Sequence, residues 1–152
     1  VNQFITLGRM PHTGWLGKLN EADIHEVENV ISVMKLQKLQ HKLFNQMSDG
    51  EKQKVLIARA LCQQTPVIIL DEPTAFLDFR NKKEILQLLA SISKELSKIV
   101  ILSTHDIEAS LQYCSKCWIM TESKTFVEIE RTEKFREEVM AVLFAGESNS
   151  HS

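Results

Sequence analysis

The chain has 152 residues, of which 43% are hydrophobic and 25% charged, a composition typical of a single soluble globular domain. The formal net charge is −2. Proteins that bind nucleic acids commonly carry an excess of basic residues, so nucleic acid is not expected as a partner of this chain. No uninterrupted apolar run approaches the roughly 20 residues that cross a bilayer, so direct insertion into a membrane is not expected either.

The three cysteines are Cys62, Cys114 and Cys117. An odd number without a regular framework favours a reducing compartment over a set of disulfides. Cys114 and Cys117 have C-x-x-C spacing, but one such pair supplies only half of a typical zinc site. We interpret them as small apolar residues where a helix passes into a strand, and a metal or redox role is the alternative.

Residues 8–17 are predicted to form a loop with fixed turns, because this stretch contains three glycines and Pro11. Asn20 offers an N-cap for the next helix, with Asp23 in its first turn. Apolar residues at helical spacing then predict an amphipathic helix that ends at about residue 36. These residues are Ile24, Val27, Ile31 and Met34. A short polar connection follows.

A second helix is predicted to begin at Ser48, because Ser48 and Glu51 have the spacing of a capping box. Val55, Ala58 and Cys62 supply its buried stripe. The start of a helix carries unpaired amides and partial positive charge, and Gly50 would let an anion approach this backbone closely. A capping box needs no ligand, so the pattern alone is equally compatible with a purely structural role.

Residues 67–70 and 99–102 are short apolar runs rich in β-branched side chains, which is typical of parallel strands covered on both faces. A helix is predicted between them, beginning after Asp78. Its apolar face consists of Ile85, Leu88, Leu89, Ile92 and Leu96.

The alternation continues with a short helix from about residue 106 to 113 and a strand at 117–120, which indicates an α/β fold. Residues 125–130 are predicted to form an edge strand. Phe135, Val139 and Val142 then mark a last helix before a polar tail.

Asp71 and Glu72 directly follow the first strand, at the end where open α/β sheets bind their ligands. Asp71 would help to hold Mg²⁺ through its water shell, and Glu72 would polarise an attacking water. The alternative is a strand that simply runs into a polar turn. His105 ends the second strand, so parallel neighbours would bring it beside Glu72 and within reach of a γ-phosphate. Otherwise, it would help to cap the helix that begins at Asp106.

A phosphate-binding loop of the form G-x-x-x-x-G-K-[ST] is missing from these residues. The nearest match ends at Gly17-Lys18, but His12 replaces the first glycine and Leu19 replaces the hydroxyl residue. We therefore expect the 152 residues alone neither to bind ATP tightly nor to hydrolyse it. Because the chain starts at Val1 rather than Met, we expect these residues to be the C-terminal part of a longer protein.

Four motifs, in this order, resemble the ATP-binding subunit of an ABC transporter over about residues 1–120. They are Met47-Ser48-Asp49-Gly50-Glu51 as the signature, Val67–Glu72 as Walker B with its catalytic glutamate, Thr74–Asp78 as the D-loop, and Ser103–Asp106 as the switch histidine. Asp49 and Glu51 depart from the commonest signature, Leu-Ser-Gly-Gly-Gln. A carboxylate near a phosphate is unfavourable unless Mg²⁺ or another cation compensates it.

The resemblance implies an α/β fold of the P-loop NTPase type, with a mostly parallel sheet flanked by helices and part of the helical subdomain of ABC proteins. The domain would be incomplete. Residues 1–47 would belong to the helical subdomain and 48–120 to the core of the ATPase domain. Residues 121–145 would add an edge strand and a C-terminal helix, and 146–152 a disordered tail.

The resemblance also assigns the roles of individual residues. ATP would lie between two subunits, with Ser48, Asp49, Gly50, Glu51 and Asp78 binding nucleotide and the signature serving the ATP of the partner subunit. Glu72 and His105 would be catalytic, and Asp71 would hold Mg²⁺.

The partners implied are a second ATPase subunit, arranged head to tail, and membrane permease subunits that contact the helix at residues 21–36. The location implied is the cytoplasm, at the inner face of the plasma membrane.

The stretch from Gly8 to Gly17 is similar to one found in ATPases of importers for iron–siderophore complexes, haem and cobalamin. Ferric siderophore or haem ranks first among these expectations. One alternative is a soluble ATPase with the same head domain, for which long coiled-coil arms or a basic surface would be expected. Another is a catalytically silent module without a phosphate-binding loop.

Overall fold

The computed structural model describes residues 1–14, 18–121 and 124–145. The chain divides into two compact units, Val1–His105 and Asp106–Ser152. The expected disordered tail lies outside the described residues. The expected domain boundaries at 47/48 and 120/121 stay predictions.

The first unit begins with helical turns that continue through residues 8–12, where a loop was predicted, so the loop prediction is wrong for these residues. Helix α1 spans Asn2–Thr6, and the 3-10 helix η1 spans Leu7–His12 with Pro11 inside it. Gly8 is needed for close packing, because a Cβ there would lie 2.2 Å from the carbonyl oxygen of Arg59. Gly14 has φ +61°, so only this described glycine marks a left-handed turn, and Gly17 lies outside the described residues.

Helix α2 spans Glu21–Val33 and begins with a capping box between Asn20 and Asp23. A buried ion pair ties this start to η1, since Arg9 Nε donates to Asp23 Oδ1 over 2.9 Å. Arg9 also donates to the carbonyl oxygen of Cys62 over 2.7 Å. The Asn20 amide and the Arg9 guanidinium together hold the pKa of Asp23 below its usual range. Arg9 therefore joins η1, α2 and the end of α3.

The buried face of α2 differs from the predicted stripe by one position. Ile24 is half exposed, and Val30 is buried alongside the predicted Val27, Ile31 and Met34. Two 3-10 turns follow, η2 at Gln37–Leu39 and η3 at Phe44–Gln46. Helix α3 then spans Asp49–Cys62, and its predicted stripe is confirmed because Val55, Ala58 and Cys62 are fully buried.

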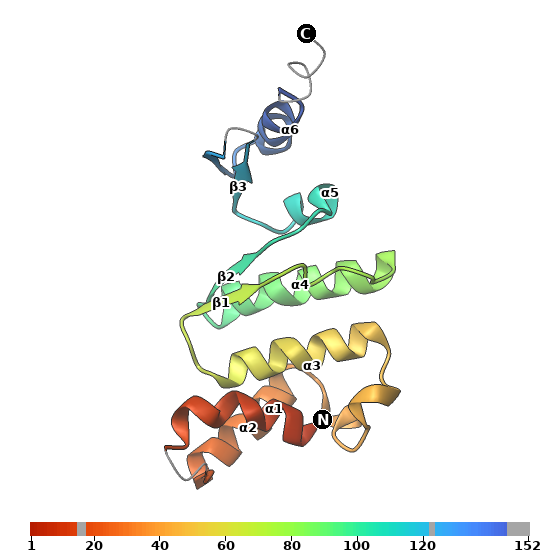
Figure 1. Ribbon diagram of the computed structural model, residues 1–152, viewed down its shortest axis with the longest axis vertical. Coiled ribbons are helices and arrows are strands. Elements are labelled where there is room, and N and C mark those ends of the chain that lie inside the picture. Colours follow the sequence, from red (N-terminus) through yellow and green to blue (C-terminus); the bar gives the residue numbers. More distant parts are fainter. Residues whose placement is uncertain (15–17, 122–123, 146–152) are drawn as a thin grey trace. The chain divides into compact units, whose positions relative to one another are not determined.

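Strands β1 (Val67–Leu70) and β2 (Ile99–Leu102) pair in parallel, with Leu70 opposite Leu102. Helix α4, Phe79–Glu95, connects them. The predicted parallel pair is confirmed. Helix α4 packs against β2 and against α3, and α1 and α2 pack against α3, which lies below α4 in Figure 1.

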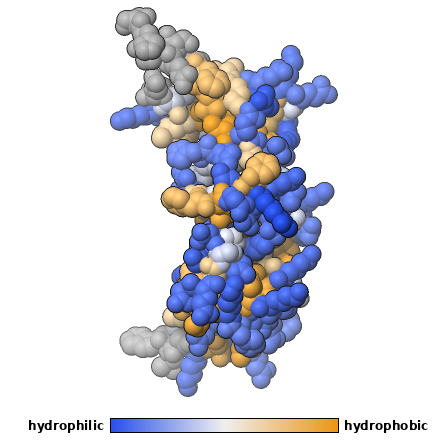
Figure 2. Space-filling model, turned by 90° about the vertical axis from the view of Figure 1, so that its right-hand side faces the viewer, coloured by the Kyte–Doolittle hydropathy of each residue, from blue (hydrophilic) through white to orange (hydrophobic). Residues whose placement is uncertain are grey.

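The prediction that both faces of these strands are covered is wrong for the described residues. Ile68 is buried in the main core, whereas Ile69 is 75% exposed and Ile99 is 59% exposed. Strand residues alternate between faces, so one face packs on the helices and the other presents branched apolar side chains. Figure 2 shows separate hydrophobic areas on a largely hydrophilic surface.

The second unit contains α5 (Ile107–Leu111), β3 (Lys116–Met120), β4 (Phe126–Glu130) and α6 (Phe135–Ala145). Strand β3 pairs antiparallel with β4 and does not extend the β1–β2 sheet. The core of this unit consists of Leu111, Ile119, Ile129, Phe135 and Val139.

Cys114 and Cys117 lie partly buried against the core of the second unit as free thiols. Burial raises the pKa of both thiols, so they stay protonated at neutral pH. This favours their interpretation as small apolar residues.

We predict that replacing Ser97 with glycine stabilises the first unit by about 1 kcal/mol, because Ser97 follows the C-cap of α4 with φ +51°, where side chains are strained. Urea unfolding measures the change. The matched control is Ser91→Gly inside α4, which should cost about 0.5 kcal/mol because glycine is a poorer helix former than serine. Equal destabilisation by both variants would contradict the prediction.

Candidate functional site

The carboxyl ends of β1 and β2 bring the predicted acidic residues against the second strand. The Ser103 amide donates to the carbonyl oxygen of Leu70 over 3.0 Å, which continues the parallel ladder past both strands. The Ser103 hydroxyl then donates to Asp71 Oδ1 over 2.5 Å and accepts from the Glu72 amide over 3.0 Å. One hydroxyl thus contacts both residues of the acidic pair.

Glu72 and His105 meet at the same end of the strands. Glu72 Oε1 lies 2.6 Å from His105 Nε2. The imidazole is 91% exposed and the glutamate side chain 37% exposed, so solvent reaches both groups. His105 therefore contacts the predicted catalytic carboxylate, as the parallel strands led us to expect.

The second predicted group lies at the start of α3. The capping box is confirmed: the Glu51 amide donates to Ser48 Oγ over 3.3 Å, and the Ser48 amide donates to Glu51 Oε2 over 2.9 Å. Ser48 and Asp49 are exposed, whereas Gly50 is buried.

Both unusual carboxylates of this segment have lysine partners. Lys42 Nζ lies 2.7 Å from Glu51 Oε2, and Lys52 Nζ lies 3.0 Å from Asp49 Oδ1. The hydrogen bond from Lys42, followed by that from the Ser48 amide, holds the pKa of Glu51 below its usual range. Glu51 is therefore ionised at neutral pH, and the lysines offset the added negative charge near the helix start.

Asn81 connects Gly50 to Asp78. The Asn81 amide donates to Asp78 Oδ1 over 2.9 Å, and its side-chain Nδ2 donates to Asp78 Oδ2 over 2.7 Å. A Cβ on Gly50 would lie 2.6 Å from Asn81 Oδ1. The absence of a side chain at position 50 thus lets α3 approach the cap of α4, in addition to any role with an anion.

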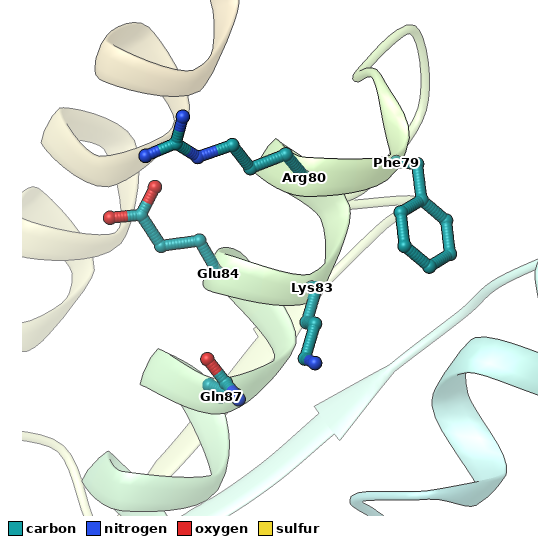
Figure 3. A pocket seen from close by; sticks show the side chains of 5 residues that line it. All are labelled: Phe79, Arg80, Lys83, Glu84 and Gln87. Atoms are coloured by element: carbon teal, nitrogen blue, oxygen red, sulfur yellow. The ribbon is translucent and has the colours of Figure 1, made fainter.

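A depression on the described surface lies elsewhere, on α4 (Figure 3). It is lined by Phe79, Arg80, Lys83, Glu84 and Gln87, with a volume of about 310 Å³. Arg80 and Glu84 point toward α3, where Lys54 Nζ lies 2.7 Å from Glu84 Oε1, and Phe79 points away. None of the predicted site residues lines this depression. Because Asp71 and His105 are exposed, the candidate site lies open to solvent at the ends of the strands.

The donors present fit a magnesium ion only in part. Asp71 offers an exposed carboxylate at a strand end, and carboxylate oxygen is a ligand that Mg²⁺ prefers. Within the described ranges, three potential metal-binding side chains do not cluster anywhere. The residues therefore fit an ion that brings its own water or phosphate ligands.

Comparison with known proteins agrees with this geometry. A protein-family model described as ABC transporter matches residues 4–75. Over these residues the chain is similar to ABC transporter proteins. It is 36% identical over 124 residues to the petrobactin import ATP-binding protein FpuC of Bacillus anthracis, with 82% of this chain and 46% of that protein covered. It is 32% identical over 113 residues to the iron(3+)-hydroxamate import ATP-binding protein FhuC of Bacillus subtilis, covering 74% and 42%.

Solved structures show the same fold. The chain superposes on an inward-facing ABC transporter structure with a TM-score of 0.85 at 26% identity, covering 95% of this chain and 58% of that one. It matches cbiO1 of Clostridium perfringens with a TM-score of 0.74 at 32% identity, covering 92% and 54%. The α/β fold of ABC ATPase domains is therefore confirmed. The chain spans about half the length of the curated relatives it matches.

The structure gathers the predicted residues into two groups. Asp71, Glu72 and His105 meet at the strand ends, and Asp78 joins the signature-like segment 48–51 through Asn81. Sequence reasoning missed Asn81 and Lys42 as parts of these groups, and it included Ser103 only as the first residue of the switch-histidine segment. Only Asn81 carried a local signal, since it stands three residues after the cap Asp78.

We predict that Gly50→Ala destabilises the chain, because the new methyl group displaces the Asn81 side chain from Asp78. In an Asn81→Ala background the same change should stabilise it by about 0.5–1 kcal/mol, as expected for alanine in a helix. A double-mutant cycle of urea unfolding measures the coupling, at about 1 kcal/mol. If the effects of Gly50→Ala and Asn81→Ala on the free energy of unfolding were additive, the predicted contact between positions 50 and 81 would be contradicted.

We also predict a pH-dependent role for Asp78 as the cap of α4. The Asn81 amide holds the pKa of Asp78 below its ordinary value of 3.8, so the unfolded chain takes up this proton first as the pH falls. The stability that the Asp78 carboxylate contributes is fully present at pH values above the ordinary pKa of 3.8. It is lost as the pH falls through the lower pKa of the folded state.

The matched variant is Asp78→Asn, which keeps a capping side chain without the charge. Its deficit in urea midpoint relative to the wild type should be present at about pH 6 and shrink at about pH 3. A deficit that is the same at both pH values would show that the charge of Asp78 is not involved.

Proposed function

We propose that these residues form the signature, Walker B, D-loop and switch segments of an ATP-hydrolysing ABC importer subunit. The observation that carries the proposal is the contact of 2.6 Å between Glu72 Oε1 and His105 Nε2, beside Asp71 at the carboxyl ends of two parallel strands. A carboxylate held by an imidazole is suited to orient a water molecule and accept its proton.

In the proposed reaction, Glu72 accepts a hydrogen bond from the attacking water and takes its proton as the water attacks the γ-phosphorus of ATP. His105 holds the Glu72 carboxylate and is exposed enough to reach the γ-phosphate. Asp71 would hold the water shell of Mg²⁺, which when bound neutralises the charge that develops on the phosphate oxygens.

The signature-like segment would bind the ATP of a second subunit. It begins a helix of 14 residues, with Ser48 and Asp49 exposed, so its partial positive charge faces outward. Lys42 and Lys52 offset the two carboxylates that would otherwise repel a phosphate. A solved relative supports a paired arrangement, because the ATP-binding cassette MJ0796 forms a dimer bound to ADP and Pi.

An iron–siderophore complex is the proposed cargo of the importer. Several curated relatives are named as siderophore, petrobactin or iron-hydroxamate import ATP-binding proteins. The segment around Arg9, which suggested this group, has a structural role in the described fold because Arg9 is buried against Asp23 and Cys62. The relatives' names therefore support this cargo more strongly than any single side chain here.

The proposed contact with the permease lies along α2. An apolar depression of about 440 Å³ is lined there by Asn2, Gln3, Thr6, Leu19, Ile24, Val27 and Glu28. Ile24 is half exposed within it. None of the described helices is long and apolar enough to span a membrane. The proposed location is therefore peripheral, against permease subunits at the inner face of the membrane.

The proposal requires a phosphate-binding loop that these 152 residues do not contain. DNA sequence upstream of the codon for Val1 should encode, in frame, a strand followed by G-x-x-x-x-G-K-[ST]. A stop codon close upstream would instead favour a catalytically silent module that pairs with an intact partner.

We predict that Glu72→Gln in the whole subunit, assembled with its permease, lowers kcat for ATP hydrolysis by at least about 100-fold. ATP binding should persist, because the amide keeps the shape of the side chain but does not accept a proton. Phosphate release and nucleotide binding are measured in parallel, together with uptake of radioactive iron–siderophore complex. Glu95→Gln on the exposed end of α4 is the control. Normal turnover by Glu72→Gln would contradict the proposed role.

A further inference from the structure

We infer that Ser103 is a positioning residue for ATP hydrolysis, because its single hydroxyl holds both Asp71 and Glu72 in place by hydrogen bonds. This inference rests on the function proposed above. Ser103 opens the switch-histidine segment, but the motif assignments gave this residue no role of its own. The inference gives its hydroxyl a role and links the metal-binding carboxylate to the catalytic one.

The placement of Ser103 follows from the strand register. Leu70 and Leu102 are opposite each other in the parallel pair, so the residues after them leave the sheet side by side. The amide of Ser103 is fixed by the Leu70 carbonyl oxygen over 3.0 Å. Its side chain therefore starts from a backbone position that β1 itself holds.

The hydroxyl is used in both of its hydrogen-bonding capacities. It donates to Asp71 Oδ1 over 2.5 Å and accepts from the Glu72 amide over 3.0 Å. A hydroxyl is the smallest side-chain group that donates and accepts at once, and a bond to a carboxylate is stronger than one between neutral groups. The two bonds thus restrain the Asp71 side chain and the Glu72 backbone through one atom.

Glu72 needs this restraint because its backbone is left-handed, with φ +46°. Such a conformation is unfavourable for a residue with a side chain and persists only where neighbouring contacts hold it. It directs the Glu72 carboxylate to His105, at 2.6 Å. Without the Ser103 acceptor, the Glu72 amide loses its partner and the turn is free to relax, which moves the carboxylate away from the attacking water.

The first test uses the 152-residue chain and does not depend on catalysis. Ser103→Ala should raise the hydrogen-exchange rate of the Glu72 amide by about tenfold, measured by NMR, because that amide loses its acceptor. Amides of α3 report whether the fold is intact. Ser103→Thr keeps the hydroxyl and should restore slow exchange. Ser91→Ala, on the exposed side of α4, is the matched control.

The second test uses the whole ATPase assembled with its permease. Ser103→Ala should lower kcat by about tenfold and leave KM for ATP unchanged, because Ser103 acts on the groups that attack and not on nucleotide binding. Ser103→Thr should recover most of kcat. If Ser103→Ala does not fold, Ser103→Cys keeps the volume with a much weaker donor and acceptor and should show the same loss.

The outcomes separate this inference from the proposed function. Faster Glu72 exchange together with lower kcat, both rescued by threonine, supports the positioning role. Unchanged exchange, or unchanged kcat in both the alanine and the cysteine variant, overturns it. A wild-type assembly without ATPase activity overturns the proposed function and the catalytic role of Ser103 with it, while the exchange test still decides whether the hydroxyl holds Glu72.

Discussion

The parallel register of β1 and β2 is the constraint on which the candidate site depends. Because Leu70 lies opposite Leu102, both strands end at the same level, and the acidic pair after one meets the hydroxyl and imidazole after the other. A slip of one residue would turn each strand's side chains to the opposite face and separate these groups. The register in turn is held by Ile68 and its neighbours in the core under α3 and α4.

The negative charges at the start of α3 are balanced by neighbouring lysines. Two carboxylates replace neutral residues of the commonest signature, yet each has a lysine within 3.0 Å. Glu51 also completes the capping box, so the same carboxylate satisfies the Ser48 amide and pairs with Lys42. Because these pairs are partly exposed, their effect is local neutralisation more than stability. The segment thus keeps an exposed helix start that is suited to an anion.

Arg9 and Gly8 show how a resemblance and a physical role can share the same residues. The segment that resembles siderophore-type importers contains the buried cation that joins η1 to α2 and α3, and the glycine that lets η1 approach Arg59. Packing among η1, α2 and α3 is therefore one physical reason for the residues that this segment shares with the importers. In the proposed importer the ATPase subunit has no need to touch the cargo, so the proposed cargo rests on the names of relatives rather than on a binding site.

The sequence by itself determined the elements whose signals are local. The starts of α2, α3 and α4 depend on caps at Asn20, Ser48 and Asp78, each of which bonds a residue only three positions away. The apolar runs of β1 and β2 were equally readable, and so was the acidic pair that follows β1. Buried stripes were predicted to within a position or two, because helical periodicity defines a face only approximately.

Only the tertiary structure decided contacts between distant residues. Ser103 lies 32 positions from Asp71, so no local pattern indicated that its hydroxyl bonds the carboxylate. The approach of Gly50 to Asn81 and of Gly8 to Arg59 gives both glycines a packing role. In the sequence, Gly8 indicated a turn and Gly50 indicated access for an anion. The pairing of β3 with β4, and the exposed face of β1, were also undecided by periodicity. Apolar alternation shows that a strand has faces, whereas the neighbours present decide which of them is covered.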